Sequence, residues 1–227
     1  DKFIIIYVNS SFHGKAKVGQ MIDGSPVFGP EATFNSGSTF HTGIAKVDEN
    51  RFVVIYKTSN GGDASVGIVD GDQITFGAPG ELPWWDGNDH VQYGYGSVDV
   101  FDDTDYFVMS YINSDSEGRV VIGKIESDNS VSFGGVRFFT TGESTCGITR
   151  AMTFSDTDFA IAYKSNGVYT FMGTRSSATS TSMSIPEGGN NNSGHVYLGN
   201  GSCPTLGTVI FAEKIADNTG LVAWDCS

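Results

Sequence analysis

A four-part pattern that recurs along the chain restricts its fold more than any other feature. The clearest copy, Gly43 to Gly80, reads GIAKVDENRFVVIYKTSNGGDASVGIVDGDQITFGAPG. It alternates short apolar, β-branched stretches with an acidic turn, a Gly/Asn loop and a Gly-Asp turn, which are the signals of strands joined by tight turns. The pattern therefore predicts four short strands in one copy, and helical periodicity occurs nowhere in the sequence.

Three landmarks align the other copies. An aromatic residue closes the second strand of each copy: Tyr7, Tyr56, Tyr111, Tyr163 and Phe211. A small residue follows within the third strand: Gly19, Gly67, Gly123, Gly173 and Ala223. The fourth strand ends in a recurring pair: Phe28-Gly29, Phe76-Gly77, Phe133-Gly134 and the degenerate Met183-Ser184. Because units of four short strands at this spacing are typical of propeller blades, we predict one all-β domain, a β-propeller of about five four-stranded blades.

The first and last blades are predicted to be incomplete. The repeats span approximately 1–40, 41–82, 83–140, 141–190 and 191–227. The first copy begins at its second strand, Phe3 to Tyr7, and the last has strands at His195–Leu198, Thr208–Phe211 and Leu221–Trp224 but no fourth. Either these blades are imperfect, or four blades carry an extra hairpin, or another chain supplies the missing strands. Because an open sheet edge is prone to associate, we expect a homo-oligomer or a partner chain that covers it.

Composition narrows the possible partners and location. The net charge of −13 argues against nucleic acid, because phosphate binding needs clustered Lys and Arg. The longest apolar run, Phe3 to Val8, is far too short to span a membrane. The sequence starts at Asp1 without a signal-like segment, which we interpret as a mature or processed form. Sequons at Asn9, Asn191 and Asn200, with an acidic composition rich in Gly, Ser and Thr, favour a secreted glycoprotein.

The three cysteines are interpreted from their places in the repeat. Cys203 falls in a turn of the last copy, and Cys226 ends a strand predicted to run toward the same face. We therefore expect a Cys203–Cys226 disulfide that stabilises the C-terminal copy by about 3 kcal/mol. The alternative is that these two residues and Cys146 are three buried thiols in a reduced protein.

The candidate ligand site is the one long departure from the repeat, residues 81–96, which read ELPWWDGNDHVQYGYG. In a propeller this connection lies on the face where the blade-to-blade loops gather. Aromatic rings stack on the C–H faces of sugars, and carboxylates and amides bind their hydroxyl groups. We expect a glycan to contact the aromatic and polar residues of this loop: Trp84, Trp85, Asp86, Asn88, Asp89, His90, Tyr93 and Tyr95. The alternative is that Trp84 and Trp85 only close the top of the central channel.

The histidines permit a metal site but do not require one. His13, His41, His90 and His195 are all expected on the loop-bearing face, and imidazole together with Asp86 or Asp89 would suit zinc or copper. The candidate ligands are His41, His90 and His195, whereas the alternative is that they are solvated loop residues. The acidic turns, such as Asp48-Glu49-Asn50, could be read as calcium ligands, but Asx turns explain them well. We expect no metal and no cofactor.

No catalytic constellation is evident in the sequence. It contains no Gly-x-Ser-x-Gly elbow, no phosphate-binding loop and no zinc motif with the proper spacing. A glycosidase would need two or more converging carboxylates. The candidates by face alone are Asp86, Asp89, Glu143 and Glu187, and none is assigned a catalytic role.

The repeat F-V-V-I-Y-K…V-G-I-V-D-G-D-Q-I-T-F-G at 52–77 resembles the short-blade propellers of secreted tachylectin-2-type lectins, and also tandem propeller repeats of uncharacterised marine proteins. This resemblance implies a propeller fold and carbohydrate binding; it implies no site residues, and the aromatic loop occurs only once in this chain. We therefore expect a secreted, non-enzymatic module that binds a glycan or glycoprotein. The alternatives are a propeller glycoside hydrolase or lyase, and a structural subunit of an extracellular assembly.

Overall fold

The computed structural model consists of strands, turns and loops. It describes residues 2–59, 61–83, 96–102, 104–113, 117–140, 148–164, 168–185, 196–199, 209–216 and 219–225. Over these ranges it contains no helix, so the predicted all-β class is confirmed. Accordingly, no helix in the described part of the chain has the length and apolarity of a membrane span. The chain divides into two compact units, residues 1–82 with 125–132 and residues 83–124 with 133–227.

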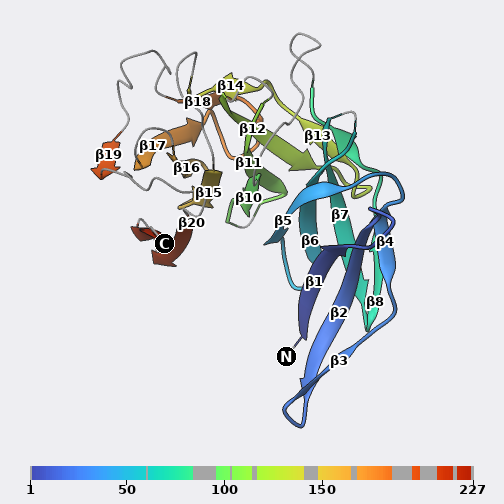
Figure 1. Cartoon of the computed structure of the whole chain (residues 1–227). Coiled ribbons are helices and arrows are strands. Elements are labelled where there is room, and N and C mark those ends of the chain that lie inside the picture. Colours follow the sequence, from blue (N-terminus) through green and yellow to red (C-terminus); the bar gives the residue numbers. More distant parts are fainter. Residues whose placement is uncertain are drawn as a thin grey trace. The chain divides into compact units, whose positions relative to one another are not determined.

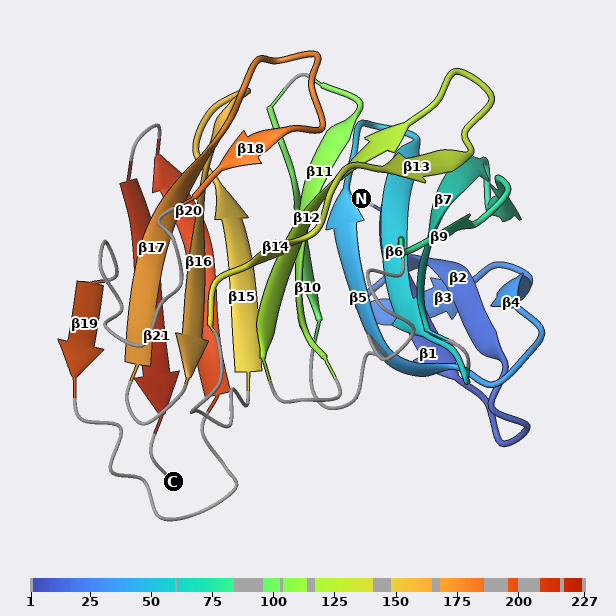
Figure 2. The ribbon, with the colours of Figure 1, turned by 90° about the horizontal axis from the view of Figure 1, so that it is seen from above.

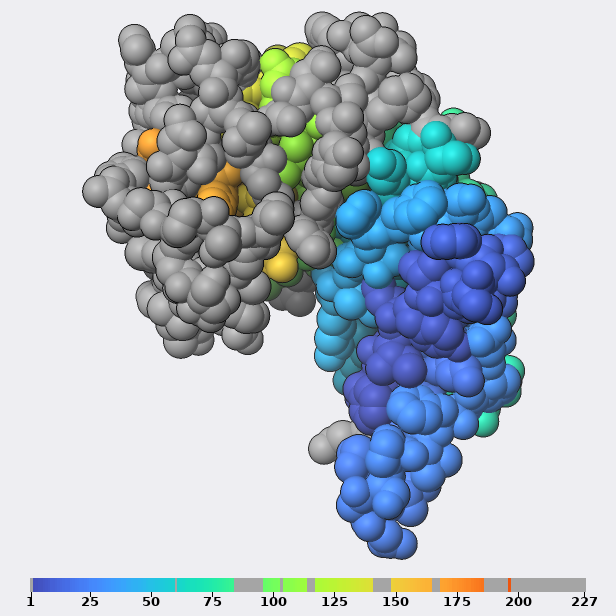
Figure 3. Space-filling view, viewed as in Figure 1, coloured from blue at the N-terminus to red at the C-terminus, as the bar shows by residue number. Residues whose placement is uncertain are grey.

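Two antiparallel sheets form the first unit (Figure 1). The first sheet contains β1 (Lys2–Val8), β2 (Gly14–Ile22), β3 (Ser25–Phe28) and β4 (Ala32–Asn35). The second sheet contains β5 (Phe40–Lys46), β6 (Arg51–Lys57), β7 (Gly62–Asp70), β8 (Gln73–Phe76) and β9 (Gly80–Glu81). The hairpin of β2 and β3 projects from the lower end of this unit in the space-filling view (Figure 3).

The remaining strands form three further antiparallel sheets (Figure 2). The third sheet contains β10 (Ser97–Val100), β11 (Tyr106–Ile112), β12 (Gly118–Ile125), β13 (Val131–Phe133) and β14 (Arg137–Phe138). The fourth contains β15 (Ile148–Thr153), β16 (Asp158–Lys164), β17 (Val168–Arg175), β18 (Met183–Ser184) and β19 (Val196–Gly199). A two-stranded sheet contains β20 (Val209–Ala216) and β21 (Thr219–Asp225).

The predicted fourth strand of each copy is two short strands on one edge. In the second sheet, β8 and β9 both pair with β7, and the first, third and fourth sheets repeat this arrangement. The break follows the Phe-Gly landmark: Gly77 donates its N–H to the carbonyl of Val66 at 2.9 Å, and the chain then turns away. A Cβ on Gly77 would collide with the carbonyl oxygen of Asn129, and Pro79 has no N–H to offer the ladder. One continuous outer strand is therefore replaced by two.

The predicted strand assignment in the last copy is wrong. β19, expected to be the inner strand of that copy, pairs instead with β17 and completes the broken outer edge of the fourth sheet. β20 contacts β15 and β16 as β15 contacts β10 and β11, so β20 and β21 take the inner and second positions. The sequence A-D-N-T at 216–219 matches the acidic turn S-D-T-D at 155–158, which joins an inner strand to a second strand. This match predicts the observed positions of β20 and β21, whereas the alignment on the aromatic residue Phe211 predicted the wrong ones.

A phenylalanine lying over a glycine recurs at the core of the sheets. Phe52 faces Gly67 across β6 and β7, and a Cβ on Gly67 would overlap the Phe52 ring. The ring of Phe76 meets Phe52 edge-on at 5.8 Å, a favourable aromatic geometry. The third strand therefore needs a small residue at this position, because a larger side chain would overlap the phenylalanine ring. Equivalent pairs occur in three other sheets: the buried Phe107 with Gly123 and Phe159 with Gly173, and the exposed Phe3 with Gly19.

Candidate functional site

All eight residues of the predicted ligand site lie outside the described ranges. This applies to Trp84, Trp85, Asp86, Asn88, Asp89, His90, Tyr93 and Tyr95, to the metal candidate His195, and to Cys203, Cys226, Asn191, Asn200, Glu143 and Glu187. Their predicted roles stay predictions. The structure does describe the chain on both sides of the aromatic loop, and it places His41 and Asn9.

The chain leading into the aromatic loop is held by the second sheet. Glu81 in β9 is paired with Asp63 in β7, and the next residue, Leu82, is buried and donates its N–H to the carbonyl of Gly62 at 2.9 Å. On the far side of the loop, the hydroxyl of Ser97 at the start of β10 accepts the N–H of Ala151 at 3.0 Å. The residues that flank the loop on both sides are therefore held by hydrogen bonds to neighbouring strands.

Four titratable residues lie where β6 ends and β7 begins, at the end of the second sheet that leads into this loop. We call His41, Lys57, Asp63 and Glu81 the polar end. Lys57 is paired with Phe40, the neighbour of His41, and also with Gly62, the neighbour of Asp63. The register thus brings together charges that the sequence places on separate strands.

Asp63 is the most perturbed carboxylate of the polar end. Burial and, as the smaller cause, the negative charge of Glu81 together raise its pKa to about 6. Desolvation disfavours the charged form of a carboxylate, and a like charge nearby adds to this effect. Asp63 therefore exchanges a proton close to neutral pH, where it can act either as a hydrogen-bond donor or as an acceptor.

His41 owes its position to an irregularity in β5. The register between β5 and β6 shifts between Phe40 and Gly43, and His41 has a positive φ of 46°, an uncommon conformation for a residue with a Cβ. A β-bulge of this kind redirects a side chain at the end of a strand. Burial and the positive charge of Lys57 lower the pKa of His41, so its imidazole is neutral at physiological pH.

The loop after β1 meets the connection that leads into β5. Phe12 accepts the N–H of Thr39 at 2.8 Å through its carbonyl, and its ring lies 5.8 Å from the ring of Phe40. The side-chain oxygen of Asn9 accepts the N–H groups of Ser11 at 3.0 Å and His13 at 2.9 Å. The sequon at Asn9 therefore stands in an Asx turn, and its glycosylation stays a prediction.

Metal binding is tested only in part. Among the residues whose placement is described, no three His, Cys, Asp or Glu side chains lie close enough together to hold a metal ion. Of the three metal candidates, His41 is a described residue, whereas His90 and His195 lie outside the described ranges. At Asp48 the predicted turn chemistry is present, because its carboxylate accepts the N–H groups of Asn50 and Arg51, each at 2.8 Å.

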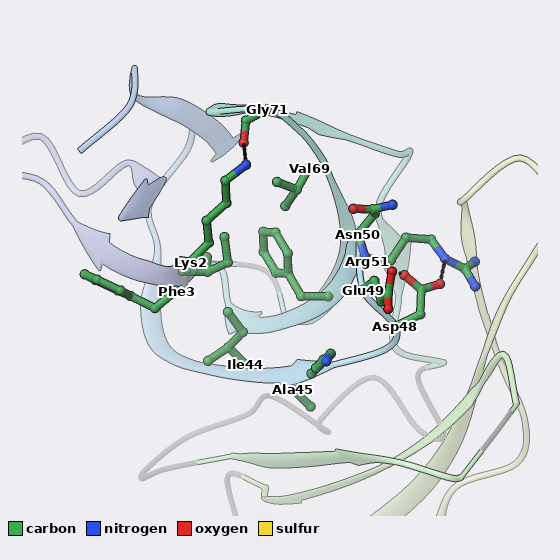
Figure 4. A pocket seen from close by; sticks show the side chains of 13 residues that line it. Lys2, Phe3, Ile44, Ala45, Asp48, Glu49, Asn50, Arg51, Val69 and Gly71 are labelled. Carbon is green, nitrogen blue, oxygen red and sulfur yellow. Dashed lines mark hydrogen bonds and ion pairs between the residues drawn. The ribbon is translucent and has the colours of Figure 1, made fainter. Parts of the chain in front are cut away.

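A groove of about 380 Å³ opens at the opposite end of β6 (Figure 4). We call it the β1 groove. One wall is the start of β1, and the facing wall is the end of β5. Lys2 donates to the carbonyl of Gly71 at 2.7 Å, and Arg51 forms an ion pair with Asp48 at 2.6 Å on its rim. The residues lining it are Lys2, Phe3, Ile4, Ile44, Ala45, Lys46, Asp48, Glu49, Asn50, Arg51, Phe52, Val69 and Gly71.

Sequence reasoning found neither the polar end nor the β1 groove. Asp63 and Glu81 lie 18 positions apart in the sequence, and only the pairing of a broken outer strand with β7 makes them neighbours. For the β1 groove a signal did exist, because the first copy was predicted to start at its second strand, and the groove lies beside that strand.

Comparison with known proteins supports the fold and leaves the family open. The chain matches no known protein-family profile and no curated protein sequence. Its structure is similar to the NanB sialidase of Streptococcus pneumoniae, both as the K499G mutant and in complex with 2-[(3-chlorobenzyl)ammonio]ethanesulfonate. In each case the TM-score is 0.51 at 11% identity, over 71% of this chain and 25% of the sialidase chain. NanB is a β-propeller, and the fold of this chain is propeller-like.

Proposed function

We propose that this protein is a non-enzymatic carbohydrate-binding module whose site is the aromatic loop, residues 84–95, which follows directly after the polar end in the sequence. Its tryptophan and tyrosine rings supply stacking surfaces for sugar C–H faces, and the carboxylates and amide of Asp86, Asn88 and Asp89 bind hydroxyl groups. We also propose that the blades, about five in number, close into a propeller and that the protein is secreted.

The observation that carries the proposal is the position of Asp63 and Glu81 next to the start of the loop. Trp84 follows Glu81 by three residues, which span at most about 11 Å even when fully extended. The polar end therefore borders the point where the chain enters the loop. Asp63 is half-buried, and burial together with the charge of Glu81 raises its pKa to about 6, so it can exchange a hydrogen bond with a hydroxyl group in either direction.

The test removes the stacking surface. The double variant Trp84→Ala with Trp85→Ala should lose retention on every glycan that the wild type recognises on an array, because aromatic stacking supplies much of the affinity of such sites. Phe12→Ala is the matched control, since Phe12 is an exposed aromatic residue outside the loop. A wild-type protein that recognises no glycan would refute the proposal.

A glycoside hydrolase is the second candidate, favoured by one observation. Asp63 and Glu81 are adjacent carboxylates, and their proximity contributes to raising the pKa of Asp63 to about 6. Glycosidases pair a protonated acid with an ionised carboxylate, and the similar structure NanB is named as a sialidase. Hydrolysis of a chromogenic glycoside panel, abolished by Asp63→Asn, would establish this function. Binding without turnover would favour the module.

A further inference from the structure

One edge of β1 has no partner among the described strands. In the three complete sheets the corresponding strand pairs there with an inner strand, as β11 pairs with β10 and β16 with β15. The carbonyl of Tyr106 in β11 accepts the N–H of Phe101 on this side, and Lys2 holds the position of Tyr106 in β1. Since alternate residues of an antiparallel strand point to opposite edges, Ile4 and Ile6 present their backbone groups to the open edge.

The β1 groove lies along this edge. Ile44 in β5 is 39% exposed, whereas Ala151, the equivalent residue of β15, is 6% exposed. Ala151 lies beside the inner strand β10. The equivalent position beside Ile44 is the groove (Figure 4), which is open to solvent. Phe3 and Ile4 are among the residues that line it.

The contact of β10 with β15 shows the chemistry that such a position requires. Ser97 accepts the N–H of Ala151 through its hydroxyl at 3.0 Å. Two residues later, the carboxylate of Asp99 accepts the N–H of Thr153 at 2.8 Å and its hydroxyl at 3.0 Å. A hydroxyl and a carboxylate, two residues apart, thus bind the outward N–H groups of the next inner strand.

β5 offers matching donors to the β1 groove. Val47 donates its N–H to the carbonyl of Arg51 across the hairpin at 2.9 Å. Because alternate amides point to opposite sides, the N–H groups of Ile44 and Lys46 face away from β6. Lys46 also replaces Thr153 at the position that meets the carboxylate of Asp99, so an ammonium group stands where the structure elsewhere places a hydroxyl donor.

We propose that the β1 groove binds an extended polypeptide strand that adds to the edge of β1 and presents a Ser or Thr hydroxyl and, two residues later, a carboxylate to β5. The backbone of the added strand pairs with Ile4 and Ile6, as in other cases of strand addition. Its carboxylate meets the N–H and ammonium groups of Lys46. The open backbone edge distinguishes this groove from a pocket for a small molecule, which would leave those backbone groups unpaired.

The test uses the whole protein and a labelled peptide, GSVDVFD, with the sequence of residues 96–102. Fluorescence polarisation should show saturable binding, and the peptide GSVNVFD should bind about tenfold more weakly, because a neutral amide replaces a charged acceptor. Hydrogen exchange followed by NMR should show new protection at the amides of Ile4 and Ile6. Absence of saturable binding, or binding without that protection, would overturn the proposal.

A substitution in the groove completes the test. Ile44→Asp places a like charge beside the bound carboxylate and should weaken binding by about tenfold or more. Ile22→Asp is the matched control, because Ile22 is similarly exposed at 47% and does not line the groove. Both variants should keep the circular dichroism spectrum of the wild type, since neither side chain is buried. Equal peptide affinity in Ile44→Asp and Ile22→Asp would refute the proposed site.

Discussion

Asp63 and Glu81 stand directly opposite each other on β7 and β9, so two carboxylates share one end of the second sheet. Burial and this neighbour raise the pKa of Asp63 to about 6, well above the value of about 3.9 in an unfolded chain. The folded protein therefore binds the proton of Asp63 more tightly than the unfolded protein does. Its contribution to stability is fully present below about pH 4 and is lost as the pH rises through about 6.

Replacing Asp63 tests this relationship through the pH dependence of unfolding. Asp63→Asn should be more stable than the wild type above pH 7, by about 1–2 kcal/mol, because it removes a carboxylate that ionises in a half-buried site. Urea unfolding at pH 5 and pH 7.5 measures the difference, and the wild type should lose more stability than the variant between these two values. Parallel curves for the two proteins would contradict the assignment.

The contact between Phe52 and Gly67 predicts a strong effect of a small substitution. Gly67→Ala should destabilise the protein by about 1–3 kcal/mol, because the added methyl group overlaps a ring that is 4% exposed. Gly135→Ala is the control, since a Cβ at Gly135 would meet no atom within 4 Å. Thermal unfolding should therefore show a lower midpoint for the first variant and almost none of this loss for the second.

Arg175 connects two loops of the second unit from a buried position. It is 1% exposed, its guanidinium lies 4.2 Å from the ring centre of Phe101 and 4.4 Å from that of Tyr106, and it donates to the carbonyls of Asp156 and Ala178. Lysine cannot reproduce a planar fork that both stacks and donates from several nitrogens.

Arg175→Lys should therefore reduce the free energy of unfolding by about 2–4 kcal/mol, through lost hydrogen bonds and lost cation–π contact. The exposed Arg137 provides the control, and Arg137→Lys should change stability by less than about 0.5 kcal/mol. Urea unfolding measures both. A small effect at Arg175 would show that water replaces the guanidinium in holding the two carbonyls.

Local chemistry explains which parts of this fold the sequence predicts. The Phe-over-Gly pairs, such as Phe52 with Gly67, are direct steric requirements, so their spacing identifies the strands and the repeat. The ends of strands depend on partners far along the chain: Gly77 breaks the outer edge because the carbonyl of Asn129 fills the space beside it. At the last copy, Phe211 has the character of the landmark, but pairing places Trp224 where Tyr163 stands in the fourth sheet.

In the candidate site, too, features set by position in the chain could be predicted, and features set by pairing between distant strands could not. His41 was expected on the loop-bearing face because its position in the chain placed it in a blade-to-blade connection. The coupling of Asp63 with Glu81 could not be predicted, because it depends on the register of a two-residue strand. The β1 groove depends on a neighbour that is not among the described strands, and residue patterns within one strand do not report such a neighbour.

The hydrogen bonds between Asp99 and Thr153 give the last prediction, and it tests the chemistry assigned to the β1 groove. Asp99→Ala leaves the N–H of Thr153 without its acceptor at 2.8 Å, and should cost about 2–3 kcal/mol. Thr153→Val removes the hydroxyl, which lies 3.0 Å from the Asp99 carboxylate and 2.9 Å from the carbonyl of Val100 as acceptors, and should cost about 1 kcal/mol. In the double variant the two losses should not add, with a coupling of about 0.5–2 kcal/mol measured by urea unfolding. Additive losses would show that a carboxylate at this position does not join adjacent inner strands, and would remove the chemical basis for expecting one in the strand that binds beside Lys46.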